Sequence, residues 1–408
     1  MDPVHDDQAD LDCAPIGSMS LTGQERARKE GEHARSARVP WTPVRADQSA
    51  PSTRCAQIAG AEQTEYNGQF RVLTATMTTF TYAVTGTPVS PATTATSLSA
   101  KVAPLGWEKP FLATHKAAYR SKNPQSPQNL LLIDNSLKTP NYTTGWAKWA
   151  NVGIVEDLSD IDTIVGAQAP YDPNNPTQNW KQVTASQWGW YKWFHARGPQ
   201  YESNGDSGGG GRNWVLIGDD RLFFLFCTNA AGYGWYGRNS YCFGDVISFK
   251  PGDNYATVLA ADDNYSGMSN YWSYPGQFSG YGLVSSLDFT GKVLLRNHTQ
   301  LGNPVRFGLT SLNTNNGQQI CGRGPTPFPN GADYSLWLLP TYVRQEDGHM
   351  RGILPGMLWM PQDRPYSDQT IVDNVVGQEG RRFLLVRTQY SSETEGAQIA
   401  FDITGPWR

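Results

Sequence analysis

Three pairs of acidic residues that are adjacent in the sequence are the first candidates for catalysis. They are Glu156 with Asp157, Asp219 with Asp220, and Asp262 with Asp263. Two carboxyl groups about 5–10 Å apart can hydrolyse a glycosidic bond. Neighbouring residues on a strand point to opposite faces, so adjacency does not bring both carboxyls to one sugar. Asp219 and Asp220 stand in Gly-Asp-Asp-Arg between two apolar runs, which indicates a hairpin turn, with a glycan hydrolase as the alternative.

Ser207 lies in Gly-Asp-Ser-Gly-Gly (205–209), the pentapeptide that surrounds the nucleophile of chymotrypsin-like proteases. Such a serine needs a nearby histidine, a carboxylate that orients the histidine, and backbone donors for the oxyanion. His115 precedes the serine, and the carboxylate would come from Asp157, Asp160 or Asp162. The loop continues as four glycines (208–211), a run too flexible to hold an oxyanion hole by itself. We favour a polar loop tip between strands over a protease.

The spacing of the usual ligands gives little support for a metal or phosphate site. The six histidines are far apart, at His5, His33, His115, His195, His298 and His349, with no H-x-H or H-x-x-x-H pattern. No D-x-D-x-D-G calcium loop occurs, and the glycine run lacks the Lys-Ser/Thr of a phosphate-binding loop. The sequence predicts no metal centre and no cofactor, while a structural ion stays open.

Aromatic residues gather in two parts of the sequence. The first group is Trp146, Trp149, Trp180, Trp188, Trp190, Tyr191, Trp193 and Phe194, and the second is Tyr233, Trp235, Tyr236, Tyr265, Tyr271, Trp272, Tyr274 and Tyr281. Rings among Gly, Ser and Asn are typical of binding surfaces, where they stack on sugars or fill interfaces. The period-two spacing within 188–193 equally fits a half-buried strand. We favour core and subunit contacts over a ligand-facing surface.

From these groups the candidate binding or interface residues are Trp188, Trp190, Trp193, Tyr233, Trp235, Tyr236, Tyr271, Trp272 and Tyr274. The five cysteines form an odd set, Cys13, Cys55, Cys227, Cys242 and Cys321, without a C-x-x-C pair. Neither a zinc cage nor a disulfide framework is therefore indicated. Cys227 and Cys242 could face each other across a hairpin, but reduced core cysteines are the favoured interpretation.

Composition excludes several classes of protein. The net charge of −4 argues against binding nucleic acid or anionic lipid through bulk charge. No apolar run approaches the roughly 18 residues that a membrane helix requires, the most apolar being Leu222–Cys227. The first residues lack the basic and apolar regions of a secretory signal, so export by that route is not expected. We expect a soluble protein with no nucleic-acid partner and no membrane insertion.

The elements that must position these residues are almost all strands. Residues 1–55 have few large apolar side chains and a charged block (23–38), which indicates an extended arm, with a short helix near 24–36 as an option. Residues 56–105 contain the turn signal Tyr66-Asn67-Gly68 followed by alternating β-branched and aromatic runs, which predicts a small β module.

Residues 106–408 contain no convincing amphipathic helix. Apolar runs at 213–226, 241–249, 291–296, 334–344 and 381–389 are separated by Gly, Pro, Asn and Asp clusters. Their irregular spacing disfavours a propeller or solenoid. We predict a large β-sandwich or barrel-like domain with long loops, within an all-β protein.

The phrase YNG-x-F-x-V followed by TTFTYAVTGTPVSPAT (66–93) resembles small β modules of bacteriophage tail and fibre proteins. Further along, APLGWEKPF with THKAAYRS (103–121), WVLIGDDRLFFLF (214–226), FGDVISFKPGD (243–253), MRGILPG (350–356) and FDITGPWR (401–408) extend the likeness. Over about residues 56–408 the chain resembles tail-associated virion proteins of Mu-like and other tailed bacteriophages of proteobacteria.

This resemblance implies a structural protein of the virion, in the tail tip, baseplate or fibre region, and not an enzyme. Its partners would be other tail proteins and copies of itself, with a homotrimer favoured. A receptor-binding attachment protein that contacts a host surface glycan or protein is the main alternative, and a glycan hydrolase is a further one. The arm (1–55) is expected to become ordered only against such a partner.

Overall fold

The structure is a computed structural model that describes residues 55–76, 79–136, 149–171, 181–184, 187–189, 191–194, 214–228, 238–263, 291–310, 336–360, 362, 366–373, 375, 377–389 and 396–408. Strands account for 59% of the structure and helix for 1%, so the prediction of an all-β protein is confirmed. Residues 1–54 of the expected arm lie outside the described residues. No helix in the described part of the chain is long and apolar enough to cross a membrane.

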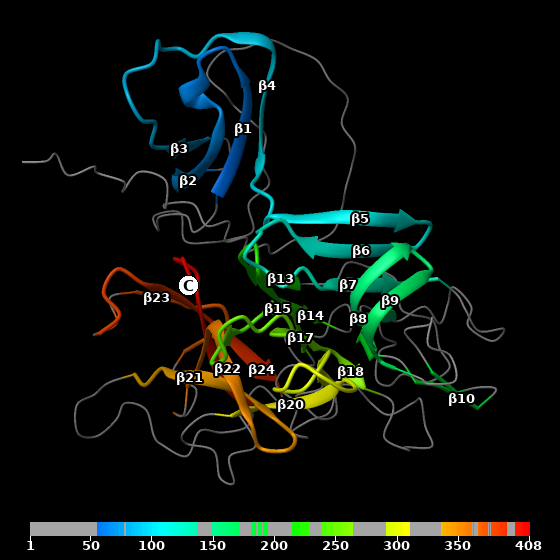
Figure 1. Cartoon of the computed structure of the whole chain (residues 1–408). Coiled ribbons are helices and arrows are strands. Elements are labelled where there is room, and N and C mark those ends of the chain that lie inside the picture. Colours follow the sequence, from blue (N-terminus) through cyan, green and yellow to red (C-terminus); the bar gives the residue numbers. More distant parts are fainter. Residues whose placement is uncertain are drawn as a thin grey trace, which may run out of the picture.

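A four-stranded antiparallel sheet comes first in the chain. Its strands are β1 (Cys55–Ala61), β2 (Gly68–Ala75), β3 (Phe80–Tyr82) and β4 (Thr94–Val102), in the order β3-β2-β1-β4. The predicted turn before Gly68 is confirmed, because the Asn67 side chain closes it with bonds to both backbone groups of Ala61 at 2.7 and 3.0 Å. Figure 1 shows this sheet, coloured from blue to cyan, apart from the other sheets.

A second sheet has seven strands. They are β5 (Trp107–Ala113), β6 (Lys116–Ser121), β7 (Leu130–Asp134), β8 (Trp149–Asp160), β9 (Thr163–Ala169), β12 (Tyr191–Phe194) and β18 (Asp262–Asp263). Their order is β18-β12-β8-β7-β6-β5, and the long strand β8 also pairs with β9. Strands β10 (Lys181–Thr184) and β11 (Gln187–Gly189) form a separate pair.

The third sheet has twelve strands and runs to the end of the sequence. They are β13 (Trp214–Gly218), β14 (Leu222–Thr228), β15 (Arg238–Asp245), β16 (Ile247–Ser248), β17 (Thr257–Ala260), β19 (Lys292–Leu294), β20 (Val305–Thr310), β21 (Leu339–Gln345), β22 (Met350–Trp359), β23 (Ile371–Asp373), β24 (Arg382–Gln389) and β25 (Gly396–Asp402). Along the sheet the order is β13-β14-β15-β17-β19-β20-β21-β22-β25-β24-β23, and β16 pairs with β22.

The apolar run in β14 is explained by burial of both faces of the strand. Phe224 and Phe226 point into a core between the two halves of the twelve-stranded sheet, where their rings lie 4.9 and 5.2 Å from that of Phe401 in β25. Phe223 points the other way and packs against the seven-stranded sheet, 6.2 Å from the ring of Trp193. Strands β13, β14, β15 and β17 therefore form the middle of three layers (Figure 1).

The same alternation separates Cys227 from Cys242. The register places Cys227 opposite Asn239 and Cys242 opposite Phe224, so the two sulfurs do not face each other across the β14–β15 hairpin. Cys242 points into the core between the halves of the large sheet, whereas Cys227 faces the seven-stranded sheet. Cys242 is a free, buried thiol, as the favoured interpretation of the sequence predicts.

We expect Cys242 to resist alkylation in the folded protein. Burial raises the pKa of this thiol to about 12, and the thiolate is the form that reacts. Iodoacetamide pulses at pH 8 followed by peptide mass spectrometry should leave Cys242 unmodified in native buffer and modify it fully in guanidinium chloride. Labelling in native buffer at the rate seen after unfolding would contradict its burial.

Candidate functional site

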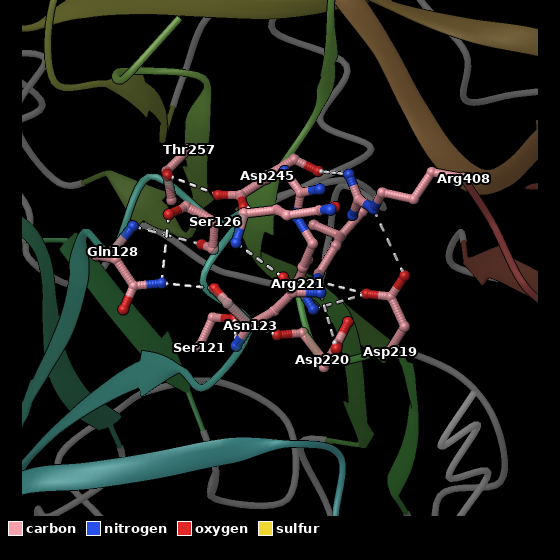
Figure 2. Close-up of polar contacts among 12 residues, drawn as sticks. Ser121, Asn123, Ser126, Gln128, Asp219, Asp220, Arg221, Asp245, Thr257 and Arg408 are labelled. Atoms are coloured by element: carbon pink, nitrogen blue, oxygen red, sulfur yellow. Dashed lines mark hydrogen bonds and ion pairs between the residues drawn. The ribbon is translucent and has the colours of Figure 1, made fainter. Parts of the chain in front are cut away.

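Segments far apart in the sequence meet at the turn between β13 and β14 (Figure 2). We call this set of polar residues the GDDR junction. It consists of Ser121, Asn123, Asp219, Asp220, Arg221, Asp245, Thr257 and Arg408. These residues come from β6 and the loop after it, the β13–β14 turn, the ends of β15 and β17, and the segment after β25.

Asp219 closes the turn at the centre of the junction. Its Oδ1 accepts hydrogen bonds from the backbone N–H groups of Arg221 at 2.8 Å and Leu222 at 2.7 Å. Burial, and to a smaller extent the charge of Asp220, raise the pKa of the Asp219 carboxyl, while Arg408 and the two backbone bonds oppose the rise without cancelling it. The hairpin turn predicted from Gly-Asp-Asp-Arg is confirmed.

Asp220 joins the turn to the seven-stranded sheet. The hydroxyl of Ser121 donates to the backbone oxygen of Asp220 at 2.6 Å, and Nδ2 of Asn123 donates to its Oδ2 at 3.0 Å. The indole Nε1 of Trp107, in β5, donates to the backbone oxygen of Asp219 at 2.9 Å. Two layers are thus held together by directed bonds as well as by apolar contact.

Asp245 is the second centre of the junction. It receives bonds from the Thr257 hydroxyl at 2.8 Å and from Nε of Arg221 at 3.3 Å. Arg408 lies between the two aspartates, with Nη1 at 3.0 Å from the backbone oxygen of Asp245 and Nε at 3.7 Å from Oδ2 of Asp219. Figure 2 shows these contacts converging from separate strands. The junction therefore ties the segment 403–408 to the middle layer.

A second buried polar cluster surrounds Arg351 at the start of β22. Its Nη2 pairs with Oδ2 of Asp253 at 2.8 Å and also donates to the backbone oxygen of Tyr255 at 3.0 Å. Its Nη1 donates to the backbone oxygen of Arg296 at 2.8 Å and to Oε1 of Gln345 at 3.0 Å. Because a buried charge is costly unless it is paired, these bonds make Arg351 and Asp253 interdependent.

Glu156, from the first acidic pair, also forms hydrogen bonds with neighbouring segments. Oε1 of Glu156 accepts from the Tyr255 hydroxyl at 2.8 Å, and its Oε2 accepts from the Ala167 N–H at 2.8 Å. Burial raises the pKa of the Glu156 carboxyl, but these bonds and the charge of Arg296 outweigh it, so the pKa lies below its ordinary value. Glu156 thus stays ionised and joins β8 and β9 to the segment before β17.

The described residues do not test the protease triad, the less favoured interpretation of the sequence. Ser207 lies outside them. Asp160 accepts from the backbone N–H of Asp162, and Asp162 forms an ion pair with Lys116, while Asp157 accepts from the N–H after it. In the third acidic pair, Asp262 and Asp263 sit in β18 opposite Lys192 and Tyr191 of β12.

Of the nine candidate aromatic residues, Trp193 is the one whose side chain is described. It is 7% exposed, its Nε1 donates to the backbone oxygen of Ala260 at 3.0 Å, and its ring stacks on Tyr241 at 5.6 Å and 15°. Trp193 therefore packs between two layers. Trp188 lies in β11, and nothing further is described of its side chain. The remaining seven, Trp190, Tyr233, Trp235, Tyr236, Tyr271, Trp272 and Tyr274, lie outside the described residues.

The fold also brings together three side chains of types that can bind a metal, a grouping that sequence spacing did not predict. His298 comes from the loop between β19 and β20, and Asp347 and His349 come from the turn between β21 and β22. One ligand atom from each residue lies within 4.8 Å of the others. The sequence gives only a weak indication of this grouping. Asp347 and His349 are separated by Gly348 alone, but His298 is far away in the chain.

No family model and no curated protein matches the chain. The contacts of the site are bonds between strands: a turn closed by Asp219, an arginine shared by Asp219 and Asp245, and a buried ion pair between Arg351 and Asp253.

Proposed function

We propose that the chain is a structural protein of a tailed-bacteriophage virion, in the tail tip, baseplate or fibre region. The proposal rests on the position of the segments that resemble tail-associated proteins. These segments contribute side chains to the GDDR junction and to the buried pair of Arg351 and Asp253. WVLIGDDRLFFLF supplies Asp219, FDITGPWR supplies Arg408, and FGDVISFKPGD supplies Asp245. MRGILPG supplies Arg351, which pairs with Asp253 of FGDVISFKPGD. The residues that carry the resemblance thus hold β layers together, which is the role expected of a scaffold subunit.

Immunogold labelling of intact particles that encode this chain tests the location. Gold should appear on the tail or baseplate at a fixed number of positions, and electron microscopy should allow the three larger sheets to be traced into density there. Label on the capsid, or absence of the chain from purified particles, would contradict the proposal.

A receptor-binding protein is the alternative, because Tyr and Trp cluster among Gly, Ser and Asn at 233–236 and 271–274. Adsorption assays separate the two roles: free protein that blocks phage adsorption to host cells favours attachment, and no effect at saturating concentration favours the scaffold. Release of reducing ends from host polysaccharide would instead indicate a glycan hydrolase.

We expect the purified chain to form a homotrimer. Only 17% of the residues are charged, and Leu112, Phe249 and Leu301 are exposed on the described surface, so contacts between copies would remove apolar surface from water. Multi-angle light scattering should give three times the chain mass of 45.0 kDa. A monomer that persists at high concentration would contradict this expectation.

A further inference from the structure

Two histidine rings and a carboxylate lie together where the β19–β20 loop, which carries His298, meets the β21–β22 turn, which carries Asp347 and His349. Nδ1 of His349 lies 3.0 Å from Oδ1 of Asp347, and Nδ1 of His298 lies 4.0 Å from its Oδ2. All three side chains are partly exposed. The cluster is therefore accessible from solvent and combines two nitrogen donors with one oxygen donor.

The carboxylate of Asp347 is held in place by hydrogen bonds from Gln345 and from the backbone of His349. Nε2 of Gln345 donates to both Oδ1 and Oδ2 at 3.2 Å, and the backbone N–H of His349 donates to Oδ1 at 3.1 Å. Gln345 is 0% exposed, and its Oε1 accepts from Arg351, which in turn pairs with Asp253. A buried chain of bonds behind a carboxylate is the usual support of a metal ligand, because it fixes the direction of the lone pairs.

His298 presents a nitrogen that lacks a hydrogen-bond partner among the described residues. Its Nδ1 is buried, and the 4.0 Å to Asp347 is too long for a hydrogen bond. The backbone oxygen of the same residue accepts from Nζ of Lys250 at 3.0 Å, which anchors the loop near the hairpin. A buried, unsatisfied nitrogen is costly, and a cation between this nitrogen and the carboxylate would give the nitrogen a partner.

We propose that Nδ1 of His298, Nδ1 of His349 and the carboxylate of Asp347 bind one Zn²⁺ ion, with a fourth position open to solvent. Ligand atoms of a tetrahedral zinc site, at roughly 2.0–2.2 Å from the metal, are about 3.3 Å apart. The distances of 3.0 and 4.0 Å lie on either side of that value. Two imidazoles and a carboxylate favour zinc over calcium or magnesium, which prefer all-oxygen sites.

Binding requires the two imidazoles to turn out of their stack. It also requires Nδ1 of His349 to give up the proton that it donates to Asp347, so that the neutral ring is protonated at Nε2. The two rings stack with their centroids 3.7 Å apart and their planes 18° apart. An imidazole nitrogen binds a metal in the plane of its ring, and one ion cannot lie in both ring planes while the rings are stacked. The His298 and His349 side chains are 38% and 54% exposed, which leaves room to turn about the bond between Cβ and the ring. The bound ion would link the loop 295–304 to the hairpin turn, a role independent of the function proposed above.

Isothermal titration calorimetry of the full chain, stripped with EDTA and titrated with ZnCl₂, tests the site. The parent should bind one more Zn²⁺ per chain than His298→Ala and His349→Ala. Asp347→Asn removes a charged ligand, so it should weaken that binding by at least the roughly 10-fold that loss of a residue behind a ligand costs. The asparagine keeps an acceptor for Gln345 and for the turn. Titration with MgCl₂ or CaCl₂ should show no binding that these substitutions remove.

His115→Asn is the matched control. His115 is an exposed turn histidine on another sheet, and asparagine tolerates its φ of 62°. This variant should bind as many Zn²⁺ ions as the parent, and Zn²⁺ should raise the thermal unfolding temperature of both but not of the cluster variants. Equal stoichiometry and affinity in parent, His298→Ala and His349→Ala would overturn the proposal, as would the absence of any Zn²⁺ binding by the parent.

Discussion

Replacing Trp193 with alanine should lower the free energy of unfolding by about 3–5 kcal/mol, the range measured when large aromatic residues are removed from protein cores. The indole stacks on Tyr241 and meets the edge of Phe223 at a ring distance of 6.2 Å, so its loss opens a cavity between two layers. It also leaves the backbone oxygen of Ala260 without the bond from the indole nitrogen. Urea unfolding followed by circular dichroism measures the change.

Two variants make this result specific. Trp193→Phe keeps a ring between the layers but loses the 3.0 Å bond to Ala260, so its cost should fall to about 1–2 kcal/mol. Trp337→Ala removes the same side chain from a position that is 38% exposed and should cost clearly less than Trp193→Ala. If both alanine variants unfolded at the same urea concentration, Trp193 would not be the contact between layers that its burial indicates.

Removing the carboxylate of Asp253 should destabilise the protein by about 3–5 kcal/mol, because it leaves a buried arginine without its counter-ion. The Arg351 and Asp253 side chains are 2% and 1% exposed. The Asp253→Ala variant retains the bonds from Arg351 to three neutral oxygens, but these do not neutralise its charge. Urea unfolding of the single variants and of Asp253→Ala with Arg351→Met completes a double-mutant cycle.

The cost of the double variant should be well below the sum of the two single costs, because no charge is then left unpaired in the interior. Glu108→Ala is the matched control. Its partner Arg120 also forms a charged pair, at 2.6 Å, but the two side chains are 37% and 33% exposed. That substitution should cost less than about 1 kcal/mol, as exposed ion pairs do. Additive costs in the cycle would show that the two residues act separately.

Local signals in the sequence were sufficient where a feature depends on a few neighbouring residues. The turn at Asp219 follows from a carboxylate that can accept backbone N–H groups two and three residues ahead, and the structure contains both bonds. The turn before Gly68 similarly depends on the side chain of Asn67. The strand at 222–226 follows from three phenylalanines among leucines between turn signals, because aromatic residues favour extended backbone.

The faces of the strands could not be read from the same signals. The run in β14 is apolar at successive positions, so the pattern of residues does not say which side chain points to which neighbour. The structure assigns Phe224 to the core within the large sheet and Phe223 to the contact with the seven-stranded sheet. The period-two pattern around Trp193 indicates which side chains share a face, but it does not say whether that face meets the core or a ligand. Packing against Tyr241 places the Trp193 ring inside.

The sequence by itself determined the all-β character and the closing of individual turns, because both depend on backbone preferences of residues close together in the chain. Only the tertiary structure decided which distant side chains meet. Arg408 reaches Asp245, Arg351 reaches Asp253, and His298 faces Asp347. Such contacts depend on how twelve strands are ordered in one sheet and how another sheet packs on it. The spacing of residues along the chain does not specify that order, because the same hairpin sequence can pair with many different neighbouring strands.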